Sequence, residues 1–222
     1  MIVHLDGECS GNRQEKTNRR LSIMSVNLQK GQKVELKKSN GGALRSVMVG
    51  LGWDEVQQSK GFFGALMGGG ADIDCDASAF LCQNGHLLGK DDVVYFGNLR
   101  HYSGCVQHMG DNLTGAGDGD DEQIMINLAA LPIQYDKIIV VVNIYQAMQR
   151  RQHFGMIRNA FIRICDADTN QELCKYNLSE NYNGMTAMIF GELYRYNGAW
   201  KFNAIGQATQ DNDIGTLASR FA

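Results

Sequence analysis

Hydrophobic and polar residues alternate in short runs along most of the chain after residue 25, and turn residues separate the runs. Alternation with a period of two is typical of strands with one buried face, because successive side chains of a strand point to opposite sides of the sheet. The pattern predicts strands at 32–37, 45–51, 77–83, 92–97, 123–128, 137–145, 160–166 and 171–177.

Residues 138–142 interrupt the alternation with an unbroken run of isoleucine and valine. A continuous β-branched run of this length predicts a central strand that is buried on both faces. Helical stretches are minor, and we expect them at 145–153 and at 211–221.

Four Asn-Gly pairs occur in the chain, at 40–41, 84–85, 183–184 and 197–198. Such a pair between alternating runs is a strong hairpin signal, because the favoured two-residue turn needs a positive φ at both central residues. If the last pair forms the turn, Arg195 faces Trp200 and Leu193 faces Phe202 across the hairpin. The guanidinium of Arg195 can then lie over the indole of Trp200.

Many short strands with turns at close spacing predict an all-β fold, a two-sheet β-sandwich with one or two short helices. The chain shows no internal repeat and no linker, so we expect one domain at 24–222. Residues 1–23 are polar and without period. They form an N-terminal extension, either a disordered arm or the product of a start upstream of a native Met24.

Composition narrows the class of protein further. The chain has 222 residues, a formal net charge of −3, and no cluster of basic residues with interleaved aromatics, so nucleic acid is not an expected partner. No apolar run approaches the length of about 18 residues that a membrane-spanning helix requires. The first 25 residues lack the apolar core of a secretion signal, which favours a cytoplasmic location.

The six cysteines show neither Cys-x-x-Cys spacing nor a Cys/His block, so a zinc site is not expected. In a reducing compartment we expect them to be free thiols that act as small buried hydrophobic residues. The sequence also lacks the common motifs of serine hydrolases, P-loop proteins and zinc proteases.

Acidic residues are concentrated in two segments. Residues 111–122 hold five carboxylates and three glycines but no basic residue. In the second segment Asp72, Asp74 and Asp76 alternate with apolar residues, so an extended strand would place all three carboxylates on one face. Clustered carboxylates with neutral oxygens and a flexible backbone suit a hard cation that takes about six to eight oxygen ligands, which favours Ca²⁺ over Mg²⁺.

The eight carboxylates exceed what one cation needs, so we expect about two neighbouring Ca²⁺ ions. Ser78 is expected to hydrogen-bond a ligand from outside the coordination shell. The predicted metal ligands are Asp72, Asp74, Asp76, Asp111, Asn112, Thr114, Gly115, Gly117, Asp118, Gly119, Asp120, Asp121 and Glu122.

An apolar, glycine-rich stretch at 60–70 runs directly into the second acidic segment. One interpretation is a flap that folds over the end of the sandwich. The other is an apolar tip that Ca²⁺ organises for a partner or a membrane surface. The residues of this possible partner loop are Phe62, Phe63, Leu66 and Met67.

The two acidic segments also carry a family resemblance. Asp-x-Asp-x-Asp-Ala-Ser-Ala at 72–79 and Asp-Asn-Leu-Thr-Gly-x-Gly-Asp-Gly-Asp-Asp-Glu at 111–122 resemble the TerD family of tellurium-resistance and general stress proteins. The resemblance extends over roughly residues 24–207, through motifs at 152–155, 158–163, 187–195 and 200–202. It implies a β-sandwich that binds calcium through these acidic loops and has no known catalysis.

Three functions are compatible with these features. The first is a non-catalytic calcium-binding module of a bacterial-type stress or tellurite-resistance system, which acts by assembly with other proteins of that system. The second is a calcium-dependent membrane-surface binder that uses Phe62 and Phe63. The third, a metal-dependent phosphoesterase, is disfavoured because no poised histidine or lysine lies near either acidic segment in the sequence.

Overall fold

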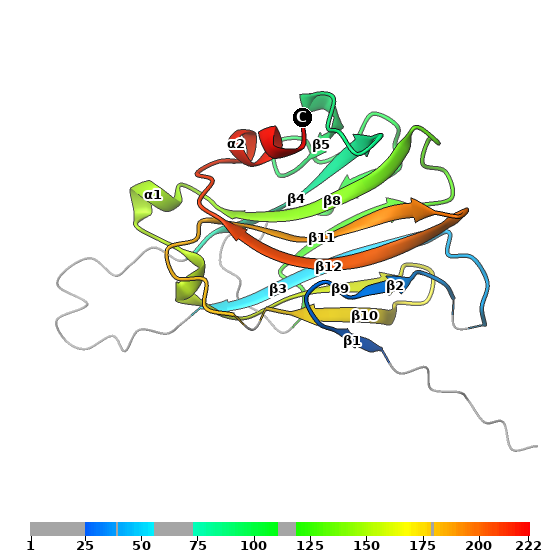
Figure 1. The fold of residues 1–222 in the computed structure, drawn as a ribbon, viewed down its shortest axis with the longest axis horizontal. Helices are drawn as coiled ribbons and strands as arrows, with labels where there is room; N and C mark the ends of the chain where they lie inside the picture. Colours follow the sequence, from blue (N-terminus) through cyan, green and yellow to red (C-terminus); the bar gives the residue numbers. More distant parts are fainter. Residues whose placement is uncertain (1–24, 39, 56–72, 111–118, 179) are drawn as a thin grey trace, which may run out of the picture.

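The computed structural model describes residues 25–38, 40–55, 73–110, 119–178 and 180–222 (Figure 1). In this part of the chain the strands form two six-stranded sheets that lie face to face (Figure 1). The predicted all-β sandwich with short helices is therefore confirmed. The predicted extension at 1–23 and the apolar stretch at 60–70 lie outside the described residues.

The first sheet has the strand order β1-β10-β9-β3-β7-β6. All of its neighbouring strands are antiparallel except β1 and β10, which are parallel. Its strands are β1 (Val26–Leu28), β3 (Ser46–Glu55), β6 (Val106–His108), β7 (Glu122–Asn127), β9 (Ile157–Asp166) and β10 (Gln171–Asn177).

The second sheet has the order β2-β12-β11-β8-β4-β5 and is antiparallel throughout. Its strands are β2 (Lys33–Glu35), β4 (Cys75–Gln83), β5 (Val93–Val94), β8 (Tyr135–Ile144), β11 (Ala187–Tyr196) and β12 (Ala199–Thr209). The predicted β-branched run lies in β8, between β11 and β4, and residues 138–142 are all buried as expected.

Two hydrophobic clusters explain why β8 is buried on both faces. The larger cluster fills the space between the sheets and includes Ile138, Val140 and Val142. The smaller cluster lies on the outer face of the second sheet and includes Ile139 and Val141. The helix α2 (Ile214–Ala218) covers this outer cluster, as Figure 1 shows above β4 and β8.

Both expected helical stretches are present but shorter than predicted. The first contains α1 (Ala147–Arg150), followed by the 3₁₀ turn η2 (Phe154–Met156). The second contains α2, whose first turn is capped by the Asp213 carboxylate, and the 3₁₀ turn η3 (Ser219–Phe221). Short helices of this kind depend on tertiary packing. The free energy needed to form the first helical turn exceeds what its few hydrogen bonds contribute.

The hairpin predicted at Asn197-Gly198 is confirmed. Both residues have positive φ, at 51° and 77°. Arg195 pairs with Trp200 and Leu193 with Phe202, as the two-residue turn requires. The Arg195 guanidinium lies 4.6 Å from the centre of the Trp200 ring.

The prediction of a strand at 92–97 is wrong in extent. The chain forms a 3₁₀ turn, η1 (Lys90–Asp92), and pairs with β4 only at β5, because a turn closed by hydrogen bonds between Tyr95 and Asn98 ends the strand. Two three-residue strands, β1 and β6, were not predicted. Three residues are too few for a period of two to be recognised.

We expect the substitution Leu217→Ala to lower the free energy of unfolding by about 2–4 kcal/mol, because Leu217 is fully buried and anchors α2 on the outer cluster. Urea denaturation followed by circular dichroism measures this change. Leu88→Ala is the control, since this exposed leucine should change stability by less than about 0.5 kcal/mol. Equal effects of the two substitutions would contradict the packing of α2.

Candidate metal site

The structure describes part of the predicted metal site. Asp74, Asp76, Ser78 and residues 119–122 belong to the described residues. The remaining predicted site residues lie outside them, namely Asp72, Asp111, Asn112, Thr114, Gly115, Gly117, Asp118 and the loop residues Phe62, Phe63, Leu66 and Met67.

The two acidic segments meet at the same end of the sandwich, where β4 and β7 begin. The Glu122 carboxylate, at the start of β7 in the first sheet, accepts a hydrogen bond from the backbone N–H of Ala77 in the second sheet. The neighbouring strand β5 pairs with β4 only at Ala79 and Phe80. Glu122 therefore occupies the edge of β4 that β5 leaves open.

Three carboxylates are buried at this end. The exposed fractions of Asp74, Asp76 and Glu122 are 6%, 3% and 2%. Burial raises the pKa of the Cys75 thiol well above its usual value. The nearby carboxylates raise it further, and they are Asp76, Glu122, Asp74 and Asp121. The residues of both acidic segments therefore act electrostatically on one point.

The alternation of β4 is as the sequence predicted for its apolar face. Cys75, Ala77 and Ala79 belong to the core between the sheets. The opposite face of β4, which carries Asp76 and Ser78, is also buried. The Ser78 hydroxyl makes no hydrogen bond to any described residue.

Asn143 contributes a neutral oxygen beside these carboxylates. It pairs with Asp76 in the β4–β8 ladder, and its amide Nδ2 lies 3.4 Å from Asp76 Oδ2. Its Oδ1 atom is buried and accepts no hydrogen bond from the described residues. A buried amide oxygen without a donor is costly, and side-chain amides are common ligands of hard cations.

Asp121 is fixed against β3 by two backbone hydrogen bonds. Its carboxylate accepts from the N–H of Trp53 at 2.8 Å, and its own N–H donates to the carbonyl of Leu51 at 2.7 Å. Burial raises the pKa of Asp121, the Trp53 N–H partly offsets this, and the carboxylates of Asp54 and Asp120 raise it again. The raised pKa therefore reflects burial first and the nearby carboxylates second.

Asp120 has a different role from its neighbours. The Arg163 guanidinium on β9 binds its two carboxylate oxygens at 2.6 and 2.9 Å, and Gln123 Nε2 lies 3.1 Å from Oδ2. A guanidinium that binds both carboxylate oxygens offsets the carboxylate charge, as a metal ion would. Asp120 is thus bound to the first sheet by protein contacts.

Glycines on β3 make room for this segment. A Cβ atom at Gly50 would lie 2.3 Å from Asp120 Oδ2, and one at Gly52 would lie 2.7 Å from the Gly119 carbonyl oxygen. No real Cβ atom tolerates such distances, so only glycine allows residues 119–120 to lie directly on the strand.

Two basic side chains approach the buried carboxylates. The His108 Nε2 atom lies 3.4 Å from Glu122 Oε2, without the geometry of a hydrogen bond. The Arg150 guanidinium on α1 lies 3.7 Å from Asp74 Oδ2. Both contacts are long for charged pairs, which prefer about 2.7–2.9 Å.

The donor chemistry of this end of the sandwich fits a hard cation. In the described part of the chain it offers buried carboxylates from both sheets and the neutral amide oxygen of Asn143. Among the described residues alone, no three His, Cys, Asp or Glu side chains converge as a complete metal site would require.

A second polar cluster contains the residue types of a serine hydrolase. Ser103 Oγ lies 2.7 Å from His101 Nδ1, and His101 Nε2 lies 3.2 Å from Asp92 Oδ1. However, Ser103 and His101 share one tight turn, in which Ser103 Oγ also accepts from the Cys105 N–H and the Gly104 N–H donates to the His101 carbonyl. These backbone N–H groups are committed to the turn, so the cluster offers no oxyanion donors from it.

The described cysteines agree with the prediction that they are buried free thiols, and they are Cys75, Cys82, Cys105, Cys165 and Cys174. Burial raises the pKa of Cys82 and Cys174 to about 12 and that of Cys165 to about 11. Protonated thiols are poor nucleophiles and poor metal ligands. These cysteines therefore act as hydrophobic residues.

Comparison with known proteins identifies the family. The profile of the TerD domain matches residues 24–221. The chain belongs to the TerD family. It is 50% identical over 199 residues to stress response protein SCP2 of Bacillus subtilis (strain 168), covering 89% of this chain and all of that protein.

A second relative is named for tellurium resistance. Tellurium resistance protein TerD of Serratia marcescens is 48% identical over 185 residues, which cover 83% of this chain and 91% of that protein. A solved homologue of telluride resistance protein (TerD) from Streptomyces coelicolor A3(2) shares the fold, with a TM-score of 0.59 and 21% identity over 81% of this chain and 99% of that one. The described helices include none that is long and apolar enough to span a bilayer.

Sequence reasoning missed several residues that shape this TerD site. Asn143 could have been noticed as a polar residue near the end of an otherwise apolar strand. Gly50 and Gly52 interrupt a hydrophobic strand, which is a known sign of a close backbone approach. Arg163 belongs to the motif at 158–163, but nothing in the sequence indicated its contact with Asp120, and Arg150 gave no signal at all.

We expect Gly50→Ala to lower the free energy of unfolding by about 1–3 kcal/mol, because the new methyl group would overlap the Asp120 carboxylate that Arg163 holds in place. Urea denaturation measures the loss. Gly89→Ala is the matched control, since Gly89 has extended backbone and open space around it. A Gly50→Ala protein as stable as the Gly89→Ala protein would show that Asp120 does not lie on β3.

Proposed function

We propose that this TerD protein is a non-catalytic calcium-binding module, in which Ca²⁺ joins the acidic segment 111–122 to the start of β4. The observation that supports it best is the burial of Asp74, Asp76 and Glu122 at one end of the sandwich, from both sheets. Its relatives are named for stress response and tellurium resistance.

The energetic reason lies in the cost of buried charge. Moving a carboxylate out of water costs several kcal/mol of solvation, by order of magnitude. Among the described residues, His108 and Arg150 approach these carboxylates at 3.4 and 3.7 Å. A divalent cation at this end would offset part of the remaining cost of burying three carboxylates close together.

The described ligands divide into two groups. Asp74, Asp76, Glu122 and the Oδ1 atom of Asn143 are buried oxygen donors at the end of the sandwich where the segments meet. Asp120 is left out of our ligand set, because Arg163 already binds it. The predicted ligands outside the described residues would complete the shell, and a total of about two Ca²⁺ ions remains our expectation.

Calcium in this role acts as a staple. Without metal the acidic segments repel, and with metal they are joined across the two sheets. We infer that function then follows by assembly with other proteins of the same stress system in the cytoplasm. The membrane-binding alternative depends on Phe62 and Phe63, which lie outside the described residues.

We expect calcium to stabilise the protein. Isothermal titration of chelator-stripped protein should show binding at micromolar or tighter affinity that Mg²⁺ does not abolish. At 100 times the dissociation constant, Ca²⁺ should add about 2.7 kcal/mol to the free energy of unfolding, and excess chelator should reverse the shift in melting temperature. Absence of both heat and thermal shift would refute the proposal.

We expect Glu122→Gln to weaken calcium binding at least about tenfold, because it removes one buried charge from the ligand set. The substitution keeps an oxygen that can accept from the Ala77 N–H, so the metal-free protein should be no less stable than the wild type. The control is Glu180→Gln, at an exposed glutamate that pairs with Lys30. Equal affinities of the two variants would remove Glu122 from the site.

A further inference from the structure

The Arg150 side chain on α1 places a positive charge beside Asp74, one of the predicted metal ligands. The Arg150 guanidinium is 3.7 Å from Asp74 Oδ2, with 29% of the Arg150 side chain and 9% of the Asp74 side chain exposed. The contact is not that of a well-formed ion pair, in which donor and acceptor approach to about 2.9 Å. The arginine lies near the carboxylate without being locked onto it.

The backbone around Arg150 keeps it in this place. Tyr145, which precedes α1, donates its N–H to the Asp74 carbonyl at 2.8 Å, and its ring lies 5.1 Å from the guanidinium carbon of Arg150. Ala147 is fully buried and anchors the helix. α1 is thus tied to the segment that carries Asp74.

The short helix also has an unusual boundary at each end. Gln146 and Arg151 flank it with φ of 51° and 54°, the left-handed region that residues other than glycine rarely adopt. This conformation is unfavourable for a residue with a side chain, so the surroundings must impose it. The four-residue helix between two such residues is a specific shape, which positions Arg150 over the acidic end.

We propose that Arg150 competes with the metal: its guanidinium serves as a counter-ion of Asp74 in the metal-free protein, and Ca²⁺ binding displaces it. This inference rests on the calcium-binding function proposed above. A guanidinium and a divalent cation repel each other, so each weakens the binding of the other when both approach the Asp74 carboxylate. Arg150 thereby lowers the affinity of the site and stabilises its empty state.

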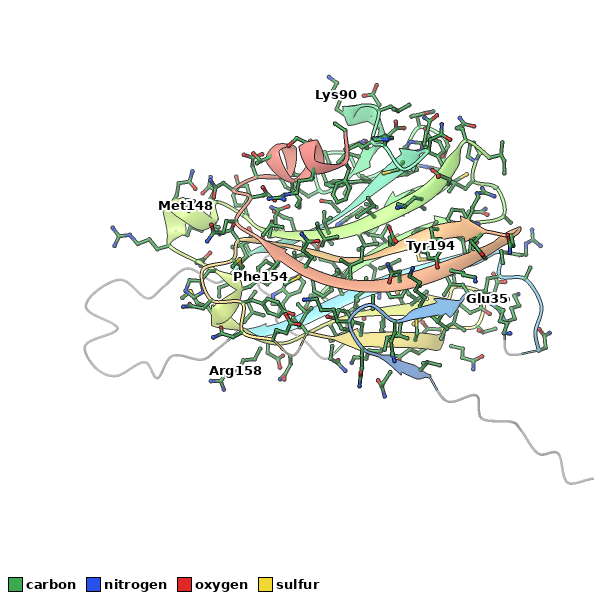
Figure 2. The ribbon with its side chains drawn as sticks, in the orientation of Figure 1. Glu35, Lys90, Met148, Phe154, Arg158 and Tyr194 are labelled. Carbon is green, nitrogen blue, oxygen red and sulfur yellow. The ribbon has the colours of Figure 1, made fainter. Side chains whose placement is uncertain are left out.

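The displacement has a consequence at the surface. Arg150 and Met148 lie on the same helix, and Met148 is 63% exposed (Figure 2). When metal replaces the arginine at Asp74, the positive charge of Arg150 becomes available on this exposed helix. Occupancy of a buried site would then change the charge that α1 presents to solvent.

The experiment compares calcium titrations of the wild type, Arg150→Gln and Arg151→Gln at one ionic strength. Arg151 is the matched control, because it is the adjacent exposed arginine and carries the same charge. We expect Arg150→Gln to bind Ca²⁺ about fivefold more tightly than Arg151→Gln, which is the scale expected for a partly exposed pair.

Melting temperatures with and without calcium supply an independent measurement. Arg150→Gln should lower the melting temperature of the metal-free protein and leave that of the calcium-loaded protein unchanged, because the pair exists only without metal. Arg151→Gln should show no such difference between the two states.

Four outcomes are distinguishable. Tighter binding by Arg150→Gln together with a larger calcium-induced thermal shift supports the competition. Equal affinities of the two variants overturn it, and weaker binding by Arg150→Gln overturns it as well, because Arg150 would then hold Asp74 in position for the metal. A wild type that binds no calcium rejects the proposed function, and the competition with it.

Discussion

The contact between the Glu122 carboxylate and the Ala77 N–H holds the acidic end of the molecule together. It joins the first residue of β7 in one sheet to an open strand edge in the other. An unpaired N–H at a buried edge would cost about 1–3 kcal/mol, and a carboxylate is the strongest acceptor available to it. The same contact brings the buried Glu122 carboxylate to the end of the sandwich that holds Asp74 and Asp76. One hydrogen bond therefore both joins the two sheets and concentrates negative charge at this end.

The first sheet limits how that charge is distributed. The glycines of β3 let the acidic segment lie flat on the strand, where Asp121 extends the hydrogen bonding of β3 and Asp120 meets Arg163. Arg163 therefore pairs with Asp120, while Asp121 accepts from the Trp53 N–H and lies near the carboxylates of Asp54 and Asp120. Neighbours with the same side chain thus make different contacts just before β7 begins.

The sequence predicted the sandwich well because its signals are local. The β-branched run of β8 and the Asn197-Gly198 turn depend only on neighbouring residues, and both are confirmed. The predicted strand at 92–97 shortened to β5 because a hydrogen-bonded turn, which the alternation did not reveal, took its second half. At the candidate site, the sequence indicated acidic ligands but not Asn143, Arg150 or Arg163, whose roles come from strand register and from helix placement.

Two arginines approach the carboxylates at this end of the sandwich at different distances. Arg163 binds Asp120 through two short hydrogen bonds, whereas Arg150 approaches Asp74 only at 3.7 Å. A tight bidentate pair is expensive to break, because separating it leaves a poorly solvated charge on each side. A long pair is cheaper to separate. The short Arg163–Asp120 pair therefore suits a structural role, and the longer Arg150–Asp74 contact suits the exchange proposed above.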